Sequence, residues 1–100
     1  MKKLAPMHPG EVLREEFLKP LNLSAGAVAK KLGLPRTRIE RIAAEETGIT
    51  VDTALRLARL FNTSTEFWLN LQRDYEVQIA EKAISKELRE IEPTIETCVA

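Results

Sequence analysis

Cysteine and histidine are nearly absent from this sequence. Cys98 is the only cysteine, so no disulfide can form within the chain, and a reducing compartment is the expected environment. His8 is the only histidine, which excludes a zinc site made of several Cys and His ligands and argues against histidine-based catalysis. The carboxylate pairs at residues 15–16 and 45–46 have neither a nucleophile nor a metal-binding residue beside them. We therefore expect a protein that is not an enzyme and has no metal or cofactor.

Long apolar runs are also missing. No stretch approaches the roughly 18 to 20 apolar residues that a membrane-spanning helix needs. The chain starts with Met1-Lys2-Lys3, but Pro6, Pro9 and Glu11 interrupt any apolar segment of the kind that a signal peptide requires. The sequence therefore predicts a cytoplasmic protein with no membrane partner.

Net charge is lacking as well, since 15 basic residues balance 15 acidic ones. The balance hides an uneven distribution. Residues 1–44 hold nine Lys and Arg against four Glu, a net charge of +5, whereas residues 45–100 hold six against eleven, a net charge of −5. A basic first part and an acidic second part suit two partners of opposite charge.

Proline, glycine and capping residues divide the chain into five or six helices. We expect helices from Pro9 to Pro20, from Ser24 to Gly33, from Pro35 to about Ala44, from Thr50 through Phe61, and from about Thr63 onward. Thr63 and Glu66 have the spacing of a capping box, with Ser64 as the alternative N-cap. The last helix either continues to about Glu92 or bends near Ile84-Ser85. No alternating β-branched segment predicts a strand, so the expected fold class is all-α with a long C-terminal helix.

The length and composition predict one hydrophobic core, because 44% of 100 residues are apolar. We expect a single domain over residues 1–92. Residues 93–100, which begin with the breaker Pro93, are expected to form a flexible tail in which Cys98 is an incidental thiol.

Residues 25–44, AGAVAKKLGLPRTRIERIAA, have the spacing of a helix-turn-helix motif. Ala29 is small enough to let the second helix approach, and Gly33 can adopt the left-handed conformation that the turn requires. Five apolar residues occupy the positions that must face the core: Val28, Leu32, Leu34, Ile39 and Ile42. The motif predicts that the helix opened by Pro35 enters the major groove of DNA by its N-terminal end.

The exposed side of that second helix carries the side chains that we expect to contact DNA. They are Arg36, Thr37, Arg38, Glu40 and Arg41. Arginine pairs with guanine O6 and N7, threonine reaches a base edge or a phosphate, and Glu40 is a candidate for contact with cytosine. Lys30 and Lys31, on the preceding helix, are expected to contact phosphates. The alternative is an ordinary pair of helices with a solvated charged face.

Three segments resemble the HigA-type antitoxins, also called plasmid-maintenance antidote proteins, of the phage-repressor-like helix-turn-helix superfamily. They are MHPGEVLREEFLKPLNLS (residues 7–24), GLPRTRIERI (residues 33–42) and GITVDTALRLARLFNTSTEFWLNLQRDYE (residues 48–76). The resemblance implies a bundle of five or more helices that dimerises and binds an operator in front of its own genes. It also implies that the protein neutralises a RelE-like toxin that cleaves mRNA.

Two positions depart from the pattern of that family. Its members usually have Gln near the start of the first motif helix, where it can bind phosphate, and this sequence has Ala25. They also tend to carry a basic Asn-Gly-Lys/Arg-like loop after the recognition helix, where residues 44–47 read Ala-Glu-Glu-Thr. Because carboxylates repel the phosphate backbone, we hypothesise that Glu45 and Glu46 lower the affinity for DNA.

The last helix has more apolar residues than a short bundle needs. Its additional stripe is a candidate isologous dimer interface, made of Val77, Ile84, Leu88 and Ile91. A two-fold homodimer would place two recognition helices about 34–36 Å apart, as a palindromic operator in double-stranded DNA requires. The aromatic residues Phe67, Trp68 and Tyr75 are expected in the core or at an interface, and His8 in a capping or packing role.

Three functions remain open at the level of the sequence. The first is an antitoxin that represses its own operon and blocks a toxin by protein–protein contact. The second is a stand-alone transcriptional repressor, and the third is a toxin inhibitor whose DNA binding has weakened, a possibility raised by Ala25 and Glu45-Glu46. The toxin-binding surface is either the acidic second half of the chain, which would complement a basic nuclease, or the N-terminal helices.

Overall fold

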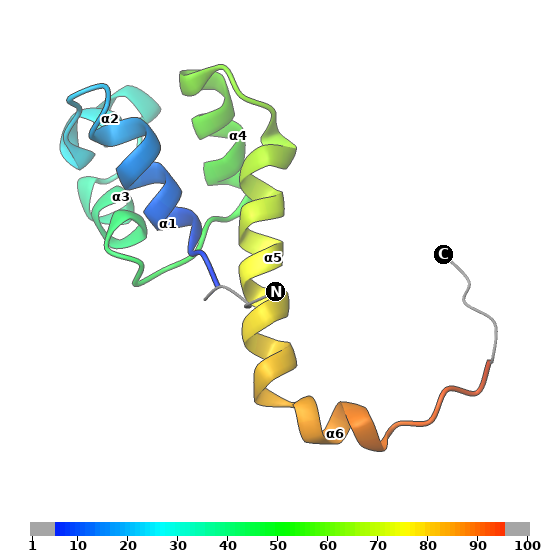
Figure 1. Ribbon diagram of the computed structural model, residues 1–100. Coiled ribbons are helices and arrows are strands. Elements are labelled where there is room, and N and C mark those ends of the chain that lie inside the picture. The colour runs from blue at the N-terminus through cyan, green and yellow to red at the C-terminus, as the bar shows by residue number, and fades with distance from the viewer. Residues whose placement is uncertain (1–5, 96–100) are drawn as a thin grey trace.

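Helices account for all of the regular structure in residues 6–95, the part of the chain that the computed structural model describes (Figure 1). In chain order they are α1 (Pro9–Val12), the π-helix η1 (Leu13–Leu18), α2 (Ala25–Leu32), α3 (Arg36–Ala43), α4 (Val51–Phe61), α5 (Thr65–Ala83) and α6 (Ser85–Glu90). The predicted all-α fold class is confirmed, as is the long helix near the C-terminus, α5. Residues 96–100 of the predicted tail, including Cys98, lie outside the described residues.

Hydroxyl side chains cap the start of three of these helices. The hydroxyl oxygens of Ser24, Thr50 and Ser64 each accept a hydrogen bond from the backbone N–H three residues later, at 3.0, 3.3 and 3.0 Å. Such a cap satisfies one of the N–H groups that the first helical turn leaves free. Gly33 ends α2 with a left-handed φ of 71°, as the predicted turn requires. The predicted caps at Ser24 and Thr50 are therefore confirmed.

Of the two N-caps predicted for α5, Ser64 is confirmed and the capping box of Thr63 and Glu66 is wrong. The Thr63 hydroxyl oxygen instead accepts a hydrogen bond of 2.8 Å from the indole Nε1–H of Trp68. Trp68 is fully buried, and a buried N–H without an acceptor costs about 1–3 kcal/mol. The Thr63 hydroxyl therefore serves the buried indole, while Ser64 caps the helix.

The first helical segment changes its hydrogen-bonding pattern partway along. After α1, residues 13–18 form a π-helix, in which an N–H bonds to the carbonyl five residues back, as that of Lys19 does to Arg14 at 3.0 Å. The sequence predicts one ordinary helix over residues 9–20. A short apolar stripe is compatible with either pattern, so its spacing predicted a helix here but not the π form.

The core lies where the first four α-helices, η1 and the start of α5 meet. Trp68 of α5 is fully buried, with the rings of Phe17 and Phe61 at centroid distances of 5.1 and 6.4 Å. The five predicted inward positions of the motif are buried or partly buried: Val28, Leu32, Leu34, Ile39 and Ile42. The predicted core face of the motif and the core position of Trp68 are confirmed.

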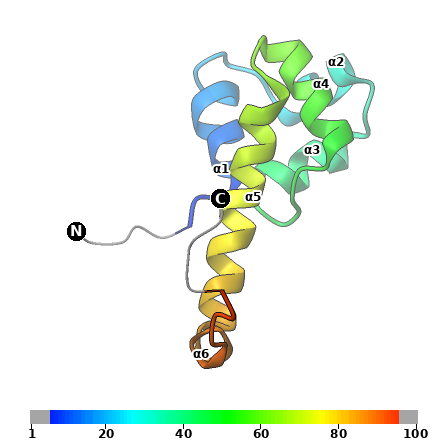
Figure 2. The same ribbon diagram turned by 90° about the vertical axis from the view of Figure 1, so that its right-hand side faces the viewer.

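The long helix α5 extends past the core and ends at a break (Figure 1, Figure 2). Ile84 has a φ of −115°, and α6 starts at Ser85 in a different direction, so the bend is the correct one of the two predicted courses. The molecule is therefore elongated, at 51 × 26 × 24 Å. The four predicted dimer residues are all exposed: Val77, Ile84, Leu88 and Ile91. Within residues 6–95 no helix is both long and apolar enough to cross a membrane.

Candidate nucleic-acid interface

The helix-turn-helix unit consists of α2 and α3. The turn between them closes with a 2.9 Å hydrogen bond from the Leu34 N–H to the Ala29 carbonyl. Ala29 is only 1% exposed, as expected for the small residue at a helix crossing. Pro35 is extended and immediately precedes Arg36, the first residue of α3. The backbone geometry that the predicted motif requires is therefore present.

All five predicted DNA contacts on α3 are exposed: Arg36, Thr37, Arg38, Glu40 and Arg41. Lys30 and Lys31 are exposed in the last turn of α2. On the opposite side of α3, Ile39 and Ile42 are buried against the core. The recognition helix is thus amphipathic, and its solvent face presents three arginines whose positive charge suits a phosphate backbone.

Ion pairs hold two of these arginines. The Arg36 Nε lies 2.9 Å from a carboxylate oxygen of Glu40, one helical turn later. The Arg38 guanidinium lies 3.5 Å from the carboxylate of Asp52, in the first turn of α4. Both pairs are solvent-exposed, so each contributes only about 0–1 kcal/mol to stability. Glu40, the predicted cytosine contact, is paired within its own helix.

A groove of about 770 Å³ lies between α3 and α4. Its lining includes Thr37, Arg38, Arg41, Thr50, Asp52 and Arg56. Arg56 was not among the predicted site residues. Its Nη1 donates a 2.6 Å hydrogen bond to the Leu32 carbonyl at the end of α2, and its Nε lies 3.0 Å from Asp52. The four-residue spacing of Asp52 and Arg56 was the signal that the sequence offered for this arginine.

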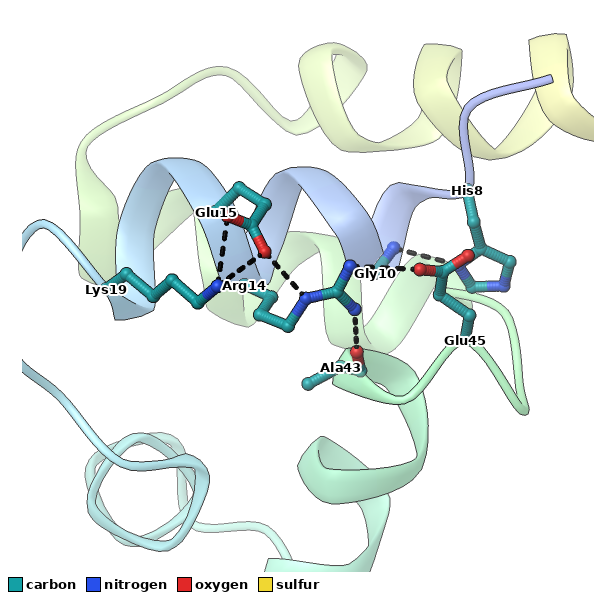
Figure 3. A network of polar contacts seen from close by, with 7 residues as sticks. All are labelled: His8, Gly10, Arg14, Glu15, Lys19, Ala43 and Glu45. Carbon is teal, nitrogen blue, oxygen red and sulfur yellow. Dashed lines mark hydrogen bonds and ion pairs between the residues drawn. The ribbon is translucent and has the colours of Figure 1, made fainter. Parts of the chain in front are cut away.

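The acidic loop after α3 is held by Arg14 of η1 (Figure 3). One guanidinium nitrogen of Arg14 donates a hydrogen bond to the Ala43 carbonyl, and another lies 3.1 Å from a carboxylate oxygen of Glu45. Hydrogen bonds to Glu15 and Glu45 raise the pKa of Arg14. Glu46 is exposed, and no residue of the described range forms an ion pair with it.

His8 caps α1 beside this loop (Figure 3). Its Nδ1 accepts a 2.8 Å hydrogen bond from the Gly10 N–H, and its ring packs edge-on against Tyr75 at 4.8 Å. Burial lowers the pKa of His8, while the charge of Glu45 opposes this shift and that of Arg14 adds to it. The predicted capping and packing role is confirmed. Among residues 6–95, no three His, Cys, Asp or Glu side chains gather in a way that could hold a metal ion.

Gly10 lets α1 pack directly against the end of the recognition helix. A Cβ atom at this position would lie 1.7 Å from the Ile42 carbonyl oxygen, so no other residue fits unless the backbone moves. Together with the hydrogen bond from Arg14 to Ala43, this contact attaches the first helical segment to the C-terminal end of α3.

Known proteins share this sequence pattern and this fold. A family profile described as helix-turn-helix matches residues 15–68. Virulence-associated protein I of Dichelobacter nodosus is 50% identical over 80 residues, which are 80% of this chain and 74% of the relative.

Two solved structures match the chain along nearly their whole length. The antitoxin HigA of Pseudomonas aeruginosa, solved with the higBA promoter, is 43% identical with a TM-score of 0.87, over 90% of this chain and 99% of that one. An addiction module antidote protein of the HigA family from Coxiella burnetii is 44% identical with a TM-score of 0.85, over the same two fractions. The similarity therefore includes the helices that follow the motif as well as the motif itself.

Proposed function

This chain belongs to the HigA-type antitoxin family of helix-turn-helix proteins, and we propose that it represses its own operon and neutralises a toxin. The observation that carries the DNA-binding part is the exposed arginine face of α3. The relative that was solved with promoter DNA supports the same function. A second partner is proposed because the charge of the chain changes sign after the motif.

The proposed DNA contacts divide into two groups. Base edges are contacted by Arg36, Thr37, Arg38 and Arg41, and phosphates by Lys30 and Lys31. Glu40 accepts a hydrogen bond from cytosine once its ion pair with Arg36 is broken, so this ion pair competes with DNA binding. The groove between α3 and α4 lies beside the base-contacting residues and gives the DNA backbone room to approach.

A homodimer completes the proposed operator complex. The apolar residues exposed on and after α5 are divided by the bend at Ile84, with Val77 on α5, Leu88 on α6 and Ile91 just after it. An isologous contact between two such ends gives the assembly a two-fold axis. The two copies of α3 then match the two half-sites of a palindromic operator.

The second proposed partner is a RelE-like toxin that cleaves mRNA, bound in the cytoplasm by contact alone, without catalysis by this chain. A ribonuclease must attract phosphates, so its surface is expected to be basic. The exposed carboxylates of α5 and α6 complement such a surface: Glu76, Glu81, Glu87 and Glu90.

Coexpression with the short reading frame beside its gene, together with operator binding by the purified protein, tests this function. We expect a tagged pull-down to recover a stable complex, and the chain to restore the growth of cells that express the partner. Operator binding without complex or rescue would leave a stand-alone repressor. A complex without operator binding would leave a toxin inhibitor with weakened DNA binding, and the absence of both would overturn the proposal.

A further inference from the structure

The structure assigns a positioning role to Arg14 and Glu45, which together fix the C-terminal end of α3 and so orient its base-reading end. This inference rests on the proposed function, because the position of α3 affects recognition only if α3 contacts DNA. It gives Glu45 a role opposite to the repulsion of phosphates that its position in the sequence predicts.

The backbone at the end of α3 is the first observation. The N–H groups of Glu45 and Glu46 bond to the carbonyls of Ile42 and Arg41, both at 2.9 Å, which is the Schellman pattern of helix termination. The residue after the C-cap in this pattern is usually glycine, because its φ is positive. Here that residue is Glu45 with a φ of 64°, a conformation that costs a non-glycine residue about 1–2 kcal/mol. Such strain persists only where the surroundings hold the residue in place.

The partner of the Glu45 side chain is the second observation. Its Oε2 lies 3.1 Å from Nη2 of Arg14, whose Nη1 donates to the Ala43 carbonyl (Figure 3). The Nε of the same guanidinium lies 2.9 Å from Glu15, which Lys19 holds in turn at 2.9 Å. A chain of charged hydrogen bonds therefore connects η1 with the last turn of α3, and the Glu45 carboxylate is paired with Arg14.

The location of this attachment is the third observation. Gly10 packs on the Ile42 carbonyl, so α1 and Arg14 both contact the C-terminal end of α3. The eight residues of α3 span about 12 Å from that end to Arg36. If the C-terminal end of a rigid helix shifts, its N-terminal end moves as well. The residues of a preorganised binding site have to be held within about 0.5 Å of their productive positions. The attachment therefore controls where the arginines of the first turn meet the bases.

The test uses the full chain and a duplex that the wild-type protein enriches from a random pool. Fluorescence anisotropy at fixed salt compares this duplex with a scrambled one for wild type, Glu45→Gln and the matched control Glu46→Gln. Positioning predicts that Glu45→Gln weakens binding to the enriched duplex about two- to fivefold, as expected for the loss of a partly exposed ion pair, and does not weaken binding to the scrambled one. Glu46→Gln should strengthen binding to both duplexes equally, because it only removes a negative charge.

Two further variants separate positioning from loss of the fold. Asparagine adopts the left-handed conformation more readily than glutamate, so the Tm of the Glu45→Asn protein should stay level or rise. Its preference for the enriched duplex should nevertheless fall as in Glu45→Gln. Arg14→Met keeps an apolar stem but lacks the guanidinium, and it should lose the same preference. Adding Glu45→Gln to Arg14→Met should cause no further loss, because Glu45 acts through Arg14.

The remaining outcomes overturn either the positioning role or the proposed DNA-binding function. If Glu45→Gln strengthens binding to both duplexes as Glu46→Gln does, the carboxylate repels DNA and the positioning role is wrong. If the preference falls only in proportion to a lower Tm, Arg14 and Glu45 serve the fold alone, which also overturns the inference. If wild type enriches no sequence at all, the proposed DNA-binding function itself fails.

Discussion

Arginine residues have two different roles in and around the motif. Arg36, Arg38 and Arg41 are exposed on α3, where a planar guanidinium can pair with a guanine edge. Arg14 and Arg56 instead donate to carbonyl oxygens at the C-terminal ends of α3 and α2. These carbonyls have no partner within their helix, and a positive charge at a helix C-terminus is stabilising. Residues outside the motif therefore hold both of its helix ends.

Replacing Arg38 with alanine is expected to cost about 1–3 kcal/mol of operator-binding free energy and to relax the preference at one base pair. Lys31→Ala should weaken binding to all sequences alike and reduce its salt dependence, because it removes only a phosphate contact. Titrations of operator and random duplexes at several salt concentrations measure both effects. Equal losses on the two duplexes for Arg38→Ala would refute its role in reading bases.

The stability of the fold is expected to fall as the pH drops below about 6.5, the ordinary pKa of histidine. Because burial lowers the pKa of His8 in the folded state, the unfolded chain takes up a proton first. The contribution of neutral His8 to the stability of the fold is complete above its unfolded-state pKa. It is lost as the pH falls through the lower folded-state pKa. Protonation also removes the lone pair that accepts from the Gly10 N–H, and such a cap is worth about 0.5–2 kcal/mol. Thermal unfolding followed by circular dichroism between about pH 8 and pH 5 measures the loss.

The matched control for this titration is His8→Asn, since asparagine also caps helices but does not titrate. Its Tm should vary little with pH above about 4.5, the ordinary pKa of a glutamate side chain. Lys19 and Arg14 lower the pKa of Glu15 in the folded state, so its contribution to stability is complete above 4.5 and is lost only as the pH falls further. A wild-type Tm that stays constant below pH 6.5 would show that His8 carries no such linkage.

The sequence predicts which side chains of α3 are exposed to solvent, but it does not reveal the residues that hold this helix in place. Helical periodicity places the arginines of α3 on the outside, because Ile39 and Ile42 must face the core. Periodicity does not reveal which carbonyl a distant arginine reaches, and Arg14 and Ala43 are 29 residues apart. For the same reason the sequence did not reveal that the Glu45 carboxylate pairs with Arg14, and its hypothesised effect on DNA affinity stays a prediction.

Among the helices, the start of α5 gives the clearest stability test. Replacing Ser64 with alanine removes its N-cap and is expected to cost about 1 kcal/mol of unfolding free energy. Thr63→Val is expected to cost about 1–3 kcal/mol, because it leaves the buried Trp68 N–H without an acceptor. Chemical denaturation at fixed protein concentration measures both, with Ser64→Thr as a control that keeps the hydroxyl. A Thr63→Val protein as stable as wild type would mean that the indole finds another acceptor.

Helix boundaries were predictable where one residue determines them. Ser24, Gly33 and Thr50 each have a conformational or capping preference that no neighbour contests. At α5 the sequence left two adjacent hydroxyls as candidate caps, because it does not show that the Thr63 hydroxyl accepts a hydrogen bond from the indole of Trp68 while Ser64 caps the helix. The bend at Ile84 contains neither proline nor glycine, so the sequence indicated its place without deciding whether it forms.

In the whole molecule, the two proposed interaction surfaces are far apart. The motif lies in the globular part of the molecule, whereas α6, which carries the exposed Leu88, lies beyond it, past the segment of α5 that extends from the core (Figure 1, Figure 2). Because the molecule is 51 Å long, a contact through its narrow end leaves the solvent face of α3 uncovered. A dimer formed at α6 is therefore compatible with two accessible recognition helices.

This arrangement predicts that wild type has twice the chain mass of 11.3 kDa in size-exclusion chromatography with light scattering at micromolar concentration. Leu88→Glu should shift the protein to a single chain, because a carboxylate in the contact would be buried without a partner. Leu21→Glu is the matched control, since Leu21 is 55% exposed against 41% for Leu88 but lies in the loop before α2.

The monomeric variant also links the dimer to recognition. Leu88→Glu leaves α3 unchanged, so it should still bind one half-site, with the same preference at each base pair. It should lose the added affinity for a palindrome, because that affinity arises from two recognition helices held about 34–36 Å apart. Titrations with duplexes that carry one or two half-sites measure the difference. Wild type that elutes as a monomer, or Leu88→Glu that stays dimeric and keeps full affinity for the palindrome, would exclude α6 from the interface.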